Sequence, residues 1–108
     1  IFQKEVFQTL RTYQFEYSHL VEQLELTYET GIEELNQVIQ DFPENKNKQQ
    51  LLKFSHDFYN NRGELANKYH KISSLLPSKL TTIFDSYFEY QRQIIENEDK
   101  VEKLVHQQ

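Results

Sequence analysis

Apolar residues recur at helical spacing through the first forty residues of this chain. They fall three or four positions apart, close to the 3.6 residues of an α-helical turn. This pattern predicts one amphipathic helix over about residues 2–41, roughly 60 Å long at 1.5 Å per residue. Its apolar stripe comprises Phe2, Val6, Leu10, Tyr13, Tyr17, Leu20, Leu24, Tyr28, Ile32, Leu35, Ile39 and Phe42.

Gly31 is the weak point of this predicted helix. Thr30 and Glu33 beside it form a capping-box pattern, which would suit a new helix start. The stripe passes Gly31 without losing its phase, so a continuous helix is favoured over a break.

A loop follows, where proline, asparagine and charged residues replace the apolar pattern over residues 41–47. Asn45 or Asn47 could cap the next helix.

The second helix is predicted over about residues 48–74, because apolar residues repeat there every seven positions with further apolar residues between them. Ser55 and Arg62 interrupt the repeat, so the expected coiled-coil packing is irregular. The apolar positions are Leu51, Phe54, Phe58, Leu65, Tyr69, Ile72 and Leu76.

Pro77 marks the second break. It could start a new helix or only kink a continuous one, and the serines around it favour a true turn.

A third helix is predicted over about residues 78–106, where another seven-residue repeat stands in a wide apolar arc. Beyond Ile95 the arc thins, since Asn97 and acidic residues enter it. The repeat consists of Leu80, Tyr87, Ile94 and Val101.

The predicted fold is therefore all-α: an antiparallel bundle or hairpin of three long amphipathic helices in one domain, residues 1–108. Apolar residues make up only 37% of the chain, although 8 Phe and 7 Tyr compensate in part. So thin a core is often completed by a partner helix, from a second copy or from another protein.

Charge alternates along the chain. Residues 1–42 hold eight acidic and two basic residues, residues 43–79 hold three and seven, and residues 80–108 hold six and three. This order suits neighbouring antiparallel helices, although exposed ion pairs contribute little each. The net charge of −5 argues against a nucleic-acid partner, despite the basic middle segment.

No apolar run approaches the roughly 20 residues that a membrane span needs, and no signal peptide is recognised. The chain begins at Ile1 with no initiator Met, which suggests a trimmed start. A cytoplasmic location is expected, and the chain could also be exported together with a secreted partner. There is no cysteine to indicate a redox compartment.

The sequence favours neither catalysis nor a cofactor. Four histidines invite a metal hypothesis, but only His19 follows a glutamate, Glu16, at the spacing of di-iron bundles. Ser55, His56 and Asp57 are consecutive, and consecutive helical residues do not face one another. The acidic run from Glu96 to Glu102 lacks the glycine and spacing of a calcium loop. No enzyme activity, metal, cofactor or small-molecule substrate is therefore predicted.

Apolar residues outside the stripes are the strongest candidates for function. Phe15 and Leu26 fall roughly opposite the stripe of the first helix and, eleven positions apart, face the same way. Phe7 lies at the flank of that stripe, and Leu52 and Tyr59 lie at the flank of the next one. These residues indicate either a partner-binding surface or ordinary exposed side chains without a role. We adopt the first interpretation for all five, with aromatic anchors supplying most of the binding energy.

Three features of the chain are similar to a known protein family: its length, its long helices rich in Gln, Glu and Lys, and its closing stretch from Tyr90 to Leu104. In these the chain resembles the small helical, WXG100-like partner proteins of LXG toxins in Gram-positive type VII secretion. There is no Trp-x-Gly turn, and Asn61-Arg62-Gly63 is the nearest segment to one. No Tyr or Phe precedes an acidic residue at the spacing of the family's export and targeting motifs. The resemblance implies an accessory protein that binds alongside a toxin's helices, and it transfers no site residue.

The predicted function is non-catalytic binding of a partner's helices, as an accessory or chaperone of a secreted protein. The alternative is a self-assembling structural or regulatory protein, such as a phage component or a small homodimeric regulator.

Overall fold

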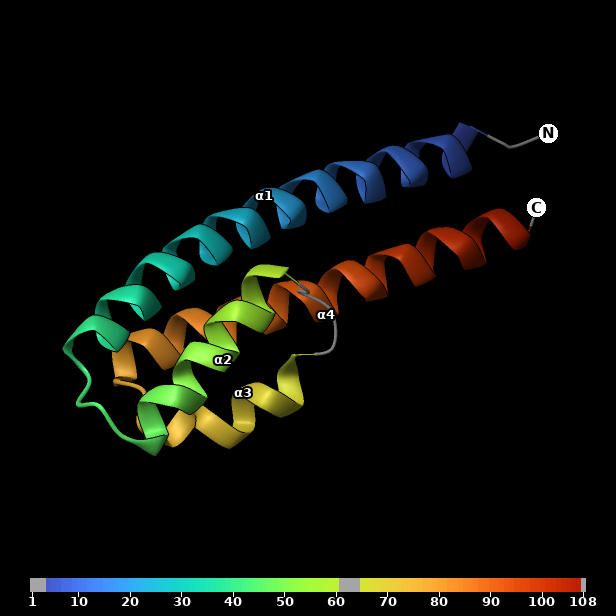
Figure 1. The fold of residues 1–108 in the computed structure, drawn as a ribbon. Helices are drawn as coiled ribbons and strands as arrows, with labels where there is room; N and C mark the ends of the chain where they lie inside the picture. The colour runs from blue at the N-terminus through green and yellow to red at the C-terminus, as the bar shows by residue number, and fades with distance from the viewer. Residues whose placement is uncertain (1–3, 61–64, 108) are drawn as a thin grey trace. The chain divides into compact units, whose positions relative to one another are not determined.

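The computed structural model describes residues 4–60 and 65–107. In order, it contains α1 (Lys4–Asp41), α2 (Lys46–Asn60), α3 (Ala66–Ile72), the short 3₁₀ helix η1 (Ser73–Leu75) and α4 (Ser78–His106) (Figure 1). The described residues contain no strand, so the predicted all-α class is confirmed.

The chain divides into two compact units. The two-helix unit takes in Ile1–Leu26 and Tyr87–Gln108, and the aromatic unit takes in Thr27–Ser86. α1 and α4 each contribute residues to both. The expectation of a single domain over residues 1–108 stays a prediction.

The first and third predicted helices agree with the structure. α1 continues through Gly31 without a break, and its predicted first positions, including Phe2, lie outside the described residues. α4 has the predicted bounds of 78–106. It remains helical past Asn97, where the apolar arc thins.

The prediction of one helix over residues 48–74 is wrong, and with it the detail of a three-helix bundle. The structure has α2, α3 and η1 in this range, and the connection between α2 and α3 includes residues 61–64, outside the described part. Leu65, directly before α3, is 2% exposed and belongs to the core. Division into shorter helices lets both α2 and α3 turn apolar residues into one core.

The helix boundaries follow local chemistry. The Asn45 side-chain oxygen accepts hydrogen bonds from the backbone N–H groups of Asn47 and Lys48, at 2.9 and 3.2 Å. Asn45 is therefore the N-cap of α2, one of the two candidates. Leu76, before Pro77, is extended with ψ of 146°. The Pro77 carbonyl accepts the first bonds of α4, from Leu80 and Thr81. Pro77 therefore separates two helices and does not kink one.

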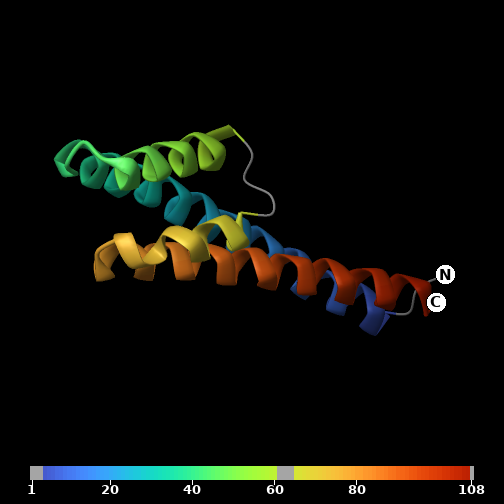
Figure 2. The same cartoon turned by 60° about the horizontal axis from the view of Figure 1, so that its bottom comes forward.

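The aromatic unit is built around a cluster of rings from three helices. Phe84 of α4 contacts Phe54 and Phe58 of α2 and Tyr69 of α3, with ring centroids 5.1–5.6 Å apart and planes near perpendicular. This edge-to-face geometry is the favourable one for aromatic pairs. Within this unit the two views show α2 beside the end of α1 and α3 beside the start of α4 (Figures 1 and 2). The predicted repeat Leu51, Phe58, Leu65 and Ile72 is buried throughout.

Gly31 lies on α1 against this cluster. A Cβ atom added there would stand 3.5 Å from Ile83 Cγ2 and from Phe84 Cε1, which is ordinary van der Waals contact. The glycine therefore leaves room for a methyl group and costs helix propensity.

We expect Gly31→Ala to raise the free energy of unfolding by roughly 0.5–1 kcal/mol, because alanine favours the helix without a clash. Urea denaturation would measure the change. Gly31→Leu is the control and should destabilise the protein, since its further atoms would collide with Phe84. An alanine variant less stable than the wild type would contradict the packing described at this position.

Tyr69 is the polar member of the cluster. Its hydroxyl lies 3.2 Å from both the Thr81 carbonyl oxygen and Asp85 Oδ1, to either of which it can donate its hydrogen. Burial, together with the negative charge of Asp85 and its hydrogen bond, raises the pKa of Tyr69 to about 12 from 10.0. The folded state therefore holds this proton more tightly than the unfolded state does.

We expect Tyr69→Phe to cost about 1 kcal/mol at neutral pH, through the lost hydrogen bond. The contribution from the raised pKa is complete below pH 10 and is lost as pH rises from about 10 to about 12. In urea denaturation, the stability difference between wild type and Tyr69→Phe should therefore be constant up to about pH 10 and smaller at pH 11. A difference that stays constant would show that Tyr69 titrates normally.

Candidate partner-binding surface

The five residues predicted to bind a partner are all exposed. Phe15 is 82% exposed on α1 and Tyr59 is 70% exposed on α2, which are large values for aromatic side chains. Phe7 and Leu26 of α1 are about half exposed, and Leu52 of α2 slightly less. Three of them, Phe7, Phe15 and Leu26, belong to the two-helix unit, and Leu52 and Tyr59 belong to the aromatic unit.

Phe15 and Leu26 share one side of α1. Eleven residues at 100° each place them within roughly 20° of one another around the helix axis. Phe15 stands there beside Arg11, Thr12 and His19, and the four residues line one surface hollow with Glu16. Phe7 is turned from Phe15 by roughly 80°. The back of α1 thus carries a large exposed ring and an aligned leucine among polar side chains.

Further exposed apolar residues escaped the sequence analysis. Ile95 of α4 is 65% exposed, and Val105 and Tyr17 are also exposed. Tyr17 belongs to the apolar stripe of α1 in the sequence, and it is still 39% exposed in the structure. The doublet Ile94-Ile95 carried a signal for Ile95, because consecutive helical residues point about 100° apart and only one can face the neighbouring helix.

The two-helix unit has a thin core. The N-terminal part of α1 and the C-terminal part of α4 lie side by side and run in opposite directions (Figure 1). Within the described part of this unit no stripe residue of α1 is fully buried, and the buried residues of α4 are Tyr87, Ile94 and Asn97. Two helices cover each other along one side only, so most of each helix surface is left to solvent.

Asn97 lies buried between these helices at 4% exposure. Its side-chain NH₂ donates to the Tyr13 carbonyl oxygen at 3.1 Å and to Glu16 Oε2 at 3.4 Å. A buried asparagine in an apolar helix interface costs stability and fixes the register of the helices. Here its polar group is satisfied by α1.

Beside Asn97 the two helices leave a groove of about 680 Å³. Tyr13 and Tyr17 of α1 and Val101 of α4 supply its apolar lining, and Glu98 and Glu102 of α4 add two carboxylates. The sequence analysis missed this groove, because it depends on which residues of two distant segments meet.

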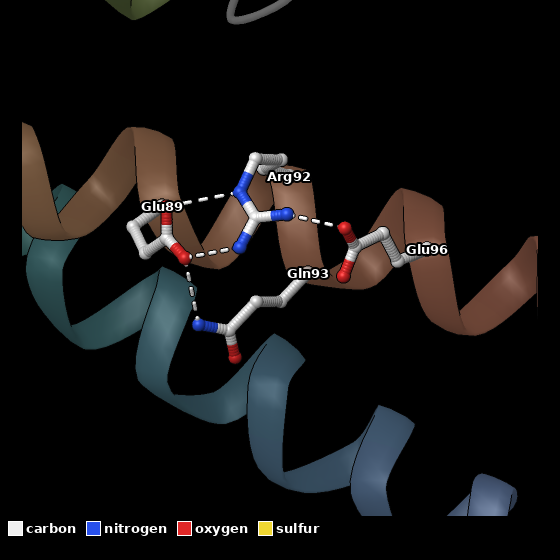
Figure 3. Close-up of polar contacts among 4 residues, drawn as sticks. All are labelled: Glu89, Arg92, Gln93 and Glu96. Atoms are coloured by element: carbon white, nitrogen blue, oxygen red, sulfur yellow. Dashed lines mark hydrogen bonds and ion pairs between the residues drawn. The ribbon is translucent and has the colours of Figure 1, made fainter.

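An ion-pair network lies on α4 in the same unit. Figure 3 shows Arg92 between Glu89 and Glu96, with Gln93 turned toward Glu89. Arg92 donates from Nε to Glu89 Oε2 at 3.0 Å, from a second nitrogen to Glu89 Oε1 at 2.5 Å, and from its third to Glu96. Gln93 Nε2 donates to Glu89 Oε1 at 3.1 Å. Hydrogen bonds from Arg92 and Gln93 lower the pKa of Glu89 to about 2, and the same pairs raise the pKa of Arg92.

The other sequence candidates do not assemble into a reactive site. Ser55 Oγ donates to Asn36 Oδ1 at 3.4 Å, the His56 ring contacts the Asn60 amide, and Asp57 pairs with Lys68 at 3.0 Å. The three consecutive side chains thus take separate partners. Within residues 4–60 and 65–107, no three His, Asp or Glu side chains gather where a metal ion could bind.

The basic middle segment forms a small hollow between α2 and α3. Lys53, Lys68 and Lys71 surround Phe54 and Ile72 there, in a volume of about 290 Å³. Lys68 is already paired with Asp57. Elsewhere in the same unit, Lys79 pairs with Glu34 at 3.3 Å, which is the kind of contact expected between basic and acidic segments.

Comparison with models of protein families, with curated proteins and with solved structures finds no match to this chain. Among the described helices, none combines the length and the apolar character needed to cross a membrane.

We expect Arg92→Gln to return the Glu89 pKa toward 4.5, because the substitution removes the bidentate guanidinium contact. The lowered pKa gives stability that is present above about pH 4.5 and is lost as pH falls toward about 2. NMR titration of the Glu89 carboxyl carbon in both proteins would measure this. Lys100→Gln, on the same helix, is the control and should leave that titration unchanged.

Proposed function

We propose that this chain is a non-catalytic binding module for the helices of another protein. The observation that carries the proposal is the pair Phe15 and Leu26, exposed and aligned on the back of α1. Large exposed apolar side chains on one face are typical of protein interaction sites, and aromatic residues dominate the energy of such sites.

The two-helix unit is the part best suited to this role. Among its described apolar residues only Tyr87 and Ile94 are fully buried, and it presents two long helices to solvent. A partner helix could pack against them by ridges and grooves, as helices do inside proteins. Binding would then supply the burial that this unit lacks.

Self-assembly is the alternative, and the charge of the two-helix unit opposes it. Ile1–Leu26 and Tyr87–Gln108 together hold nine acidic and five basic residues, a net charge of −4. Two copies meeting through this unit would bring like charges together. A melting temperature that rises with protein concentration would favour self-assembly over our proposal.

We also propose that the partner is a secreted protein, with this chain as its accessory. The support for this finer assignment is the resemblance to the partner proteins of LXG toxins in length, composition and closing stretch. Affinity purification of the tagged chain from its native host, with mass spectrometry, tests it. We expect one helical secreted protein to co-purify in near-equal amount. Recovery of the chain alone would show that the assignment of a secreted partner is wrong.

We expect the double change Phe15→Ala and Leu26→Ala to weaken binding of the co-purifying partner by at least about thirtyfold, as loss of anchor residues does. Calorimetry would measure the affinity, and circular dichroism should show unchanged helicity. Gln8→Ala with Glu22→Ala, two exposed polar positions of α1, is the matched control and should bind normally. Collapse of the dichroism signal would mean that Phe15 and Leu26 are core residues, and unchanged affinity would place the interface elsewhere.

A further inference from the structure

The groove beside Asn97 is lined by both apolar and acidic side chains. Tyr13, Tyr17 and Val101 are its apolar residues, and Tyr17 is 39% exposed. Asn97 also lines the groove, and its hydrogen bond to the Tyr13 carbonyl oxygen ties α4 to α1 there. The groove is therefore a feature of the packed helices and not of a loop.

The two carboxylates of the groove stand four residues apart on α4, where like charges repel one another. Glu98 has no ion-pair partner among the described residues, and Glu102 has only His106, at 3.8 Å and only when the histidine is protonated. By contrast, Glu89 and Glu96 on the same helix both pair with Arg92 (Figure 3). Within the described part of the chain, no Lys, Arg or His side chain lines the groove.

We propose that this groove binds an amphipathic helix that carries Lys or Arg beside its apolar stripe. The apolar residues would cover Tyr13, Tyr17 and Val101, and the cations would pair with Glu98 and Glu102. Charge complementarity selects this occupant, because the groove and its whole unit are acidic, with the net charge of −4.

Geometry favours a helix as the occupant. The groove lies between two helix segments of about one and a half turns each, and a third helix packed there would complete a three-helix arrangement. Glu98 and Glu102 lie roughly 6 Å apart along the axis of α4. Cations three or four residues apart on a packed helix have nearly the same separation.

This inference rests on the proposed function and names the chemistry of the partner. It concerns a different side of α1, since Tyr13 and Tyr17 are each turned from Phe15 by roughly 160°. The groove and the Phe15 face can therefore be tested independently.

The test uses three synthetic peptides of roughly 20 residues with one leucine stripe, long enough to form a helix. They carry Lys, Gln or Glu beside the stripe, and fluorescence anisotropy with the full chain measures their affinities at low salt. We expect the Lys peptide to bind at least tenfold more tightly than the Glu peptide, with the Gln peptide between them. Equal affinities, or no binding of the Lys peptide, would overturn the proposal.

Matched variants separate the groove from general attraction to an acidic protein. Glu98→Gln with Glu102→Gln should weaken the Lys peptide about five- to tenfold, as loss of two exposed ion pairs does. Glu5→Gln with Glu22→Gln removes the same charge from exposed positions outside the groove and should change the affinity less than twofold. If the two double variants had equal effects, the net charge of the protein would explain the attraction, and the proposed site would be wrong. Tyr17→Ala should weaken the Lys and Gln peptides alike.

The outcomes also separate this inference from the proposed function. If the groove variants bind the peptides and the native partner normally while the Phe15 and Leu26 variant loses the partner, the groove is not the site and the function stands. If the chain self-associates in light scattering and Glu98→Lys with Glu102→Lys abolishes it, a second copy occupies the groove, which overturns the proposed partner.

Discussion

The fold depends on the contact of Phe84 with three other rings. Phe54 and Phe58 reach it from α2, and Tyr69 reaches it from α3. Each of these helices is too short to be stable alone in water, so their order comes from burial against one another. Gly31 brings α1 to the same cluster. Most of the hydrophobic stabilisation of the chain is concentrated there, in its central residues.

The two-helix unit has the opposite balance. Its described residues include three that are fully buried, Tyr87, Ile94 and Asn97, and the last of these is polar. A buried polar residue in a helix interface fixes the register of the two helices and lowers the stability of their contact. The exposed surface that remains holds both features on which the functional proposals rest, the Phe15 face and the acidic groove. The fully buried core and the proposed recognition surfaces thus lie largely in different parts of one chain.

The sequence predicted the class of fold and most of the core, because helical burial depends on spacing that can be counted. The seven-residue repeat of Leu51, Phe58, Leu65 and Ile72 identified buried residues correctly. It also concealed the division into α2 and α3, since Leu65 before α3 still packs into the core that α2 covers.

The candidate site was predictable in part. Residues that fall off a stripe, such as Phe15, are exposed for the same geometric reason that the stripe is covered. The groove could not be found this way, because it requires knowing that Tyr13 lies against Asn97, 84 positions further along the chain. In the sequence, Asn97 stands where the apolar arc of the third predicted helix thins. In the structure its side chain is buried and donates to two acceptors on α1, so the two helices remain packed at this point.

The shortness of α3 has a consequence for the exchange of its backbone hydrogens with solvent. Its seven residues hold Tyr69 and Ile72 in the core, with Leu65 directly before them. Because so short a helix has almost no independent stability, its amides open only when the core opens. The hydrogen-bonded amides of α3, from Tyr69 onward, should therefore exchange as slowly as those of the much longer helices that it contacts. Their protection would report the stability of the whole aromatic unit.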